Sequence, residues 1–252
     1  MGQAAIASVA TLAGRSGQAE AALPTPHDVG RKLHPDGRVR RFPGNTFIHH
    51  LAQQGDGFEF FNELLNLYRE APRHAFARKI AWTPPSSYHM TVFAGFNEED
   101  RGTPKSPSAV AAGRSLEEIT AQWLEQFRTG LDITSTRVRM KFGTAAYTEG
   151  GSPHIPLVPA DESSRRVLAQ LRDALSALTG IRGSDHERYE FHITYGYVFH
   201  WLSRTEAQAL QGFTEYWTRQ LEKRFGMLEI DGVQFCSFED MYAFRVLHEL
   251  KK

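Results

Sequence analysis

Two short stretches of the sequence combine residue types that could move protons. YHMTVF and FHITYG each place a histidine, an apolar residue and a threonine directly after an aromatic residue. Both stretches are typical of β-strands, in which alternate side chains share a face, so His89 and Thr91 should point one way, as should His192 and Thr194. One triplet alone would be interpreted as a structural histidine bonded to a nearby carbonyl. Two triplets in matched settings favour a function.

The chemistry that such a pair could perform is acid and base catalysis on a phosphodiester. With an ordinary pKa near 6.5, one neutral imidazole can accept a proton while a protonated one donates to a leaving oxygen. The threonine hydroxyls could donate hydrogen bonds to the non-bridging phosphate oxygens. His89, Thr91, His192 and Thr194 are therefore the predicted catalytic residues. This chemistry requires no metal ion.

The residues between the histidines and threonines should form the buried side of the same strands. Met90 and Val92, like Ile193 and Tyr195, alternate with the polar positions and should pack under helices. Gly196 follows on the side of Thr194, where the missing side chain is expected to leave room for a ligand.

The elements that must position these strands can be predicted from periodicity and turn signals. Apolar residues at helical spacing predict helices over 58–71, 115–130, 161–180 and 205–226, the second opened by a capping box of Ser115 and Glu118. Extended patterns predict strands over 46–52, 76–82, 87–96, 136–147, 154–160, 188–199, 228–235 and 241–250. Each half of the chain thus orders its elements alike around one His-x-Thr strand, which indicates an internal duplication.

Composition excludes several classes of protein. The chain has 252 residues, 41% of them hydrophobic, and no continuous apolar run of membrane-spanning length. Basic and acidic residues are balanced at 29 each, so no overall field favours a long duplex nucleic acid or an anionic membrane. The single cysteine, Cys236, excludes an internal disulfide framework and is expected to be a buried thiol.

The N-terminus leaves two alternatives open. Residues 1–26 form either a flexible tail or a signal-peptide remnant, because an apolar run precedes Ala19-Glu20-Ala21 but no basic region comes before it. The tail is favoured, and with it a cytoplasmic location; a signal remnant would mean export to the periplasm. Residues 27–252 are expected to form a single bilobal domain.

At the two motifs the sequence resembles the two-histidine (2H) phosphoesterase superfamily. The runs HPDGRVRRFPGNT, YHMTVF, FHITYGY and FCSFEDMYAF look like its bacterial branch, described only as a 2H phosphodiesterase-like domain of unknown function. The resemblance implies an α+β fold of two pseudo-symmetric lobes, with antiparallel sheets flanked by helices around a central cleft. It also implies metal-free hydrolysis of cyclic or terminal phosphodiesters, often 2′,3′-cyclic phosphates on RNA or nucleotides.

The balanced net charge of the chain limits which substrates are expected. A nucleotide or another small cyclic phosphate is favoured over a long RNA, although RNA ends remain candidates, and the protein is expected to act as a monomer without a cofactor. The alternative function is a non-catalytic module that binds nucleotides or RNA ends on the same fold. A weaker option is an enzyme for a non-nucleotide cyclic phosphate, regulated by a lid formed from the Pro/Gly/Ser-rich loop 101–114.

Other candidates are less specific. Arg139 and Lys141 alternate with apolar residues, as does Arg137, so they could line the cleft and hold phosphate, or form a solvated sheet face. Phe93, two residues beyond Thr91, could stack on a base or belong to the core. The remaining histidines lack metal-binding spacing, so no metal site is predicted. The Glu239-Asp240 pair is expected to lie in a solvated turn.

Overall fold

The computed structural model describes residues 25–55, 57–103, 106–107 and 113–251. The tail or signal remnant predicted for residues 1–26 therefore lies almost entirely outside the described residues, as does much of the loop 101–114. None of the helices within the described ranges is both long and apolar enough to cross a membrane.

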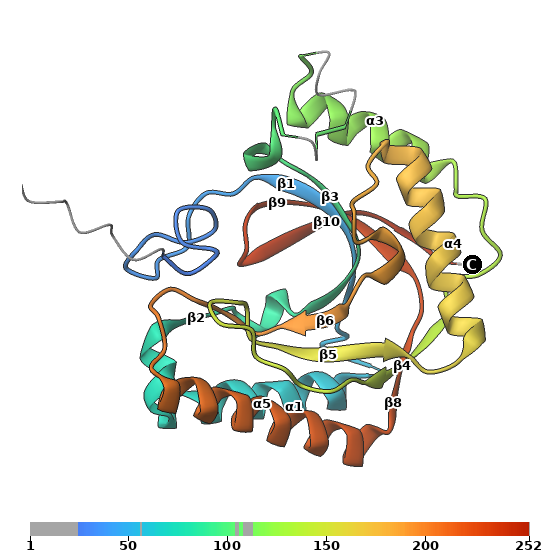
Figure 1. The fold of residues 1–252 in the computed structure, drawn as a ribbon. Helices are drawn as coiled ribbons and strands as arrows, with labels where there is room; N and C mark the ends of the chain where they lie inside the picture. Colours follow the sequence, from blue (N-terminus) through green and yellow to red (C-terminus); the bar gives the residue numbers. More distant parts are fainter. Residues whose placement is uncertain (1–24, 56, 104–105, 108–112, 252) are drawn as a thin grey trace, which may run out of the picture.

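The framework is one curled sheet of eight strands, and every neighbouring pair in it is antiparallel. From edge to edge the order is β10 (Ala243–Leu250), β9 (Val233–Asp240), β1 (Gly44–His50), β3 (His89–Asn97), β6 (Phe191–Thr194), β5 (His154–Pro159), β4 (Val138–Phe142) and β8 (Met227–Ile230). Two groups of four strands thus meet where β3 pairs with β6. The α+β fold with antiparallel strands and flanking helices is confirmed (Figure 1).

The two groups are not the two halves of the sequence. The C-terminal hairpin β9–β10 pairs with β1 and so completes the group that begins the chain. A second, two-stranded sheet joins β2 (Ile80–Trp82) to β7 (Gly196–Val198) and links the groups again. The element order of each half does repeat. The group of strands that contains β1 is nevertheless completed by β9 and β10, from the other end of the chain.

Four long helices pack on one face of the sheet, outside its curl (Figure 1). They are α1 (Phe58–Glu70), α3 (Leu116–Arg128), α4 (Glu162–Thr179) and α5 (Arg204–Phe225). The predicted capping box opens α3, where the Ser115 backbone N–H donates to the Glu118 carboxylate at 2.8 Å. Gly180 ends α4 with a φ of 71°, a left-handed conformation that favours glycine.

The helix-covered face of the central strands forms the core, as predicted. Met90, Val92, Ile193 and Tyr195 are at most 2% exposed. The Tyr195 hydroxyl lies 2.6 Å from the hydroxyl of Thr214 on α5, so even the polar end of this ring has a partner. Because alternation fixes the other face, the histidines and threonines of both triplets lie on the side away from the helices.

Several predicted strands are shorter or divided. Residues Ala75–Lys79 form a 3₁₀ helix, so only the end of the stretch 76–82 is a strand. The stretch 188–199 divides at Tyr195 into β6 and β7, which join different sheets, and 228–235 divides at Gly232, whose φ of 91° turns the chain between β8 and β9. Glu239 and Asp240 end β9 and do not form a turn, whereas Cys236 is buried as expected.

Gly196 has a different role from the one its position suggested. A Cβ atom there would lie 2.6 Å from Ile80 Cγ2 and 3.2 Å from the Ala81 carbonyl oxygen. The missing side chain therefore allows β2 to approach β7 and does not leave room for a ligand. The strand pair fills the space that was expected to hold substrate.

Candidate active site

The two His-x-Thr triplets lie on neighbouring strands at the centre of the sheet. Met90 of β3 pairs with Ile193 of β6 in antiparallel register. Antiparallel pairing about this point brings His89 beside Thr194 and Thr91 beside His192. The two histidines are then diagonal neighbours, for which Cα separations are roughly 7–8 Å. One phosphate group can therefore be reached from both imidazoles.

The strands on either side extend this polar row with two more histidines. On β1, His50 pairs with His89, and on β5, His154 pairs with Thr194. The His154 ring centroid lies 4.7 Å from that of His192, and the His50 ring centroid lies 6.2 Å from that of His89. Each histidine of the triplets thus has a second imidazole next to it.

The backbone holds both triplet histidines in the same orientation. Nδ1 of His89 lies 2.7 Å from the Ser87 carbonyl oxygen, and Nδ1 of His192 lies 2.7 Å from the Glu190 carbonyl oxygen. A carbonyl only accepts hydrogen bonds, so Nδ1 carries the proton in both rings. Nε2 is then the nitrogen of each ring that can accept or donate a proton to a substrate.

Burial makes both imidazoles poor at holding a charge. Burial, followed by the repulsion of His50 and His192, lowers the pKa of His89 from 6.5 to about 4, although the bond to Ser87 opposes the shift. Burial and the neighbouring His154 likewise lower the pKa of His192 to about 4. At neutral pH both rings are neutral in the free protein.

A buried cation and an aromatic ring hold the threonine of the first triplet. The Tyr189 hydroxyl forms a hydrogen bond with the Thr91 side chain. The guanidinium of Arg172 lies 4.2 Å from the centroid of the Tyr189 ring and donates to the carbonyl oxygens of Val92, at 2.7 Å, and His186. Arg172 is 6% exposed, so its guanidinium is buried against the Tyr189 ring.

Phe93 and the basic residues of β4 do not join this cluster. The β1–β3 register skips Val92, pairing Phe47 with Phe93 but Ile48 with Thr91, and this β-bulge takes Phe93 out of the alternation. Phe93 is 3% exposed and packs against Phe47 in the core, so the stacking role proposed for it is wrong. An aromatic ring that does lie against a triplet histidine is that of Phe244, 4.4 Å from His89 between ring centroids.

The exposed basic residues of β4 lie at a distance from the histidines. Lys141 pairs with Val158 of β5, whereas His192 pairs with Pro156, so Lys141 is two strands away and further along the sheet. The guanidinium of Arg139 lies 2.7 Å from the carboxylate of Asp161, which caps α4. Arg137 is exposed and paired with Asp231. Their proposed contact with a phosphate at the two histidines is not supported by these positions.

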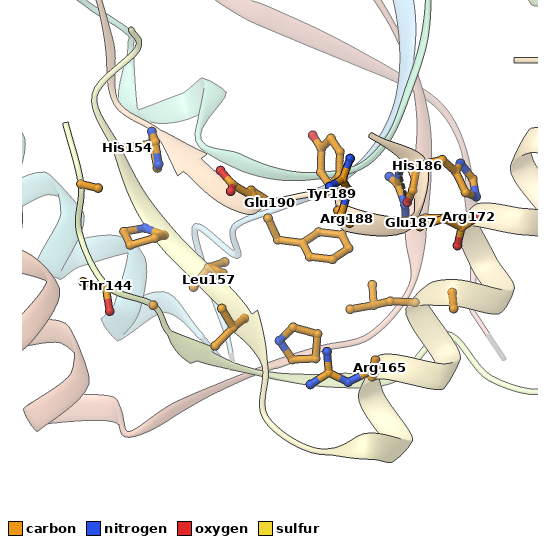
Figure 2. A pocket seen from close by; sticks show the side chains of 18 of the residues that line it. Thr144, His154, Leu157, Arg165, Arg172, His186, Glu187, Arg188, Tyr189 and Glu190 are labelled. Atoms are coloured by element: carbon orange, nitrogen blue, oxygen red, sulfur yellow. Dashed lines mark hydrogen bonds between the residues drawn. The ribbon is translucent and has the colours of Figure 1, made fainter. Parts of the chain in front are cut away.

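A groove leads away from His154 along the second group of strands. Its volume is about 720 Å³, within the range of small-molecule pockets. Figure 2 shows His154 at one end, Arg165 on α4 at the other, and the segment from Glu187 to Glu190 along one side. Because the His154 ring contacts His192, the groove begins next to the paired histidines.

One group of side chains in the described part of the chain has the composition of a metal site. Ligand atoms of Asp173, His186 and Glu187 lie within 4.8 Å of one another. Both carboxylates are already paired with Arg182, and His186 Nε2 lies 3.0 Å from Asp173. An ion-pair network accounts for these residues without a metal.

Sequence reasoning missed the residues that surround the triplets. His50 and His154 carry no motif of their own, and only strand register reveals that they join the row. A weak signal was available for His154, since HIPLVP alternates like the triplet strands. The other missed residues come from loops and distant segments: Lys32, Tyr189 and Phe244.

Comparison with known proteins gives a structural neighbour for the fold and a family match for part of the chain. No curated protein matches the chain. Among solved structures, the conserved protein of unknown function ATU0111 from Agrobacterium tumefaciens is 24% identical with a TM-score of 0.78, covering 89% of this chain and 92% of its own. Apo LigT from E. coli is 12% identical with a TM-score of 0.44, covering 84% of this chain and 98% of its own.

The Agrobacterium tumefaciens structure shares the fold with this chain. A family model described as "2H-phosphodiest: Domain of unknown function (DUF1868)" matches residues 32–150, which include the first His-x-Thr triplet. The second triplet lies beyond the matched range, and the antiparallel pairing of β3 with β6 brings it beside the first. The resemblance noted in the sequence is confirmed over residues 32–150, where the chain matches this 2H-phosphodiesterase family model.

Proposed function

We propose that this protein is a metal-independent phosphodiesterase that hydrolyses cyclic or terminal phosphodiesters, such as 2′,3′-cyclic nucleotides. The observation that carries the proposal is the side-by-side placement of two His-x-Thr triplets, each with Nδ1 bonded to a carbonyl and Nε2 left for chemistry. The family match adds independent support for phosphodiester chemistry.

The proposed reaction needs one base and one acid. Nε2 of one histidine takes a proton from water as the water oxygen bonds to phosphorus. The ester P–O bond breaks, and the leaving oxygen receives a proton from Nε2 of the other histidine. A cyclic phosphodiester becomes a phosphomonoester and a free hydroxyl, and exchange with solvent restores both rings. Thr91 and Thr194 are proposed to donate to the non-bridging oxygens, where charge increases in the transition state.

The depressed pKa values fit this scheme only if the substrate supplies charge. With a pKa of about 4, His89 and His192 are both neutral at pH 7, so neither is an acid in the free protein. A phosphodiester anion between the two rings favours protonation of one of them, since an opposite charge at short range raises an imidazole pKa. Binding of a phosphate anion is therefore expected to be accompanied by proton uptake.

The groove beside His154 supports a substrate larger than phosphate. Its volume of about 720 Å³ can hold a nucleoside-sized substituent next to the paired histidines. Polar and aromatic groups, including Thr144, Tyr189 and Glu190, line it (Figure 2). A small phosphodiester with one organic substituent is thus the proposed class of substrate.

Phosphorus NMR on a panel of cyclic phosphodiesters, run with EDTA present, tests the proposal. The panel contains 2′,3′-cyclic and 3′,5′-cyclic nucleotides, an RNA fragment with a cyclic end and a non-nucleotide cyclic phosphate. Conversion of at least one member to a monoester in EDTA is the expected result. Saturable binding of a panel member without any product would instead favour a nucleotide-binding module, and loss of activity in EDTA would contradict the metal-free mechanism.

A further inference from the structure

Lys32 lies in a tight turn that precedes the first strand of the sheet. The Asp28 carbonyl oxygen accepts from the backbone N–H groups of Lys32, at 2.9 Å, and Leu33, at 3.0 Å. The Lys32 Nζ atom lies 3.0 Å from an Asp28 carboxylate oxygen and 4.6 Å from the centroid of the Tyr197 ring. The side chain of Lys32 is 21% exposed, whereas that of Asp28 is 5% exposed.

Hydrogen bonds fix this turn to the half of the site that contains His192. The Ser152 hydroxyl donates to the second Asp28 carboxylate oxygen at 3.0 Å. The Ser152 carbonyl oxygen lies 2.8 Å from Nδ1 of His154, whose ring contacts His192. The charge of Lys32 is itself close enough to His192 to be one of the influences, after burial and His154, that lower the pKa of that imidazole.

Lys32 keeps its charge in this position. Burial favours the neutral amine, but Tyr197 and Asp28 outweigh it, so the pKa of Lys32 is raised and the ammonium is charged at neutral pH. An ammonium has three donors, of which Asp28 engages one from the buried side. Because the Lys32 side chain is 21% exposed, a further acceptor can approach the ammonium.

We propose that Lys32 binds the substrate's phosphate next to His192, with Asp28 as the residue that positions it. This inference rests on the proposed function and adds a specific electrostatic contact to it: a compact point charge that suits a phosphate oxygen. Two other basic side chains near the sheet are already engaged, since Arg172 bonds to backbone carbonyls and Arg139 pairs with Asp161. The charge of Lys32 also adds to the effects of burial and His154 that disfavour protonation of His192.

Comparison of Lys32→Met with Lys32→Arg tests the proposal directly. Lys223→Met on the exposed end of α5 removes the same charge far from the turn and serves as the matched control. Isothermal titration with adenosine 2′-monophosphate measures anion binding without turnover, and NMR titration of the histidine Cε1–H signals measures the pKa of His192. Thermal unfolding of each variant checks that it remains folded.

Lys32→Met is expected to weaken binding of the nucleotide by about 10-fold or more, as loss of a charge-assisted hydrogen bond does. The pKa of His192 should rise in the same variant, because a nearby positive charge is removed. Lys32→Arg should retain most of the binding, and Lys223→Met all of it. Unchanged binding and an unchanged His192 pKa in folded Lys32→Met would overturn the inference.

The two proposals fail separately. If the wild-type protein converts no cyclic phosphodiester but Lys32→Met still weakens nucleotide binding, the enzymatic proposal fails and the anion contact stands. If the wild-type protein is active and Lys32→Met has the wild-type KM, kcat and nucleotide affinity, the contact fails and the enzymatic proposal stands.

Discussion

The two halves of the site share their proposed catalytic residues but differ in what surrounds them. Each half has a histidine whose Nδ1 lies 2.7 Å from the carbonyl oxygen two residues earlier, and a threonine beside the other half's histidine. Burial lowers the pKa of both His89 and His192 to about 4. As proton-transfer groups they are equivalent.

Their surroundings are not equivalent. His89 packs against the Phe244 ring and lies beside His50, whose Nδ1 lies 2.8 Å from the Gln234 side chain. His192 lies beside His154, with the charged pair of Lys32 and Asp28 nearby. In the proposed mechanism the symmetric part of the fold provides the acid and base groups, and the asymmetric segments give the two halves different surroundings.

The difference between the halves therefore lies in what surrounds the two histidines, since burial lowers both pKa values to about 4 and Lys32 acts on His192 only after burial and His154. The predictions that follow test the equivalence of the two halves first and their differences afterwards.

Replacing either triplet histidine should have the largest effect. His89→Ala and His192→Ala should each reduce kcat for a 2′,3′-cyclic nucleotide by about 10²- to 10⁴-fold, since each removes one proton-transfer group. His200→Ala, at an exposed position outside the site, is the control. Phosphorus NMR time courses measure the rates, and a wild-type rate in either single variant would show that the halves are not both catalytic.

Replacing the threonines should have a smaller but still large effect. Thr91→Val and Thr194→Val each remove a proposed donor to the non-bridging oxygens, and losing such a donor costs about 10²- to 10³-fold in kcat. Thr205→Val makes the same substitution at an exposed position at the start of α5, outside the site, and serves as the control. If kcat is unchanged while only KM rises, the threonines bind substrate without stabilising the transition state.

The Tyr189 hydroxyl should matter only in one half. Tyr189→Phe removes the hydrogen bond to Thr91 but leaves the ring on Arg172, so we expect a fall in kcat of about 3- to 10-fold, typical of one neutral hydrogen bond. The exposed Tyr216→Phe is the matched control. In the double variant with Thr91→Val, Tyr189→Phe should cause little further loss of kcat. In the double variant with Thr194→Val, the two losses of kcat should multiply. Equal effects in both pairings would contradict a local role.

Acidification should destabilise the protein through both histidines. Their folded pKa of about 4 lies below the ordinary value of 6.5, so the unfolded chain binds protons first and stability falls as pH drops from about 6.5 to about 4. His89→Gln and His192→Gln should each flatten this dependence in urea unfolding at pH 7, 6 and 5. Part of the pH dependence should remain in both variants, because burial also lowers the pKa of His49 to about 4. Identical slopes in all proteins would mean that the triplet histidines are not buried as described.

Local sequence patterns predicted the helices, the faces of the triplet strands and the residues of the core. Capping signals and alternation depend on neighbours in sequence, which explains why the bounds of α3 and α4 and the burial of Met90 and Ile193 could be predicted. The strand divisions at Tyr195 and Gly232 depend on which sheet each segment joins, and no local pattern reports that.

The predictions about the site were wrong where contacts between distant parts of the chain determine the structure. A single skipped residue, Val92, moved Phe93 into the core, and the approach of β2 filled the space beside Gly196. The row of four histidines depends on register between strands far apart in sequence. Lys32, proposed to contact the phosphate, comes from a turn more than 150 residues before His192 and belongs to no motif.

Turnover of a 2′,3′-cyclic nucleotide by the double variant His89→Ala/His192→Ala, measured by phosphorus NMR in the presence of EDTA, tests the central claim most directly. The account predicts that the wild-type protein forms the monoester in EDTA, while the folded double variant is slower by at least the factor lost in either single variant. A double variant with wild-type turnover would contradict it, because no paired-histidine mechanism could then operate.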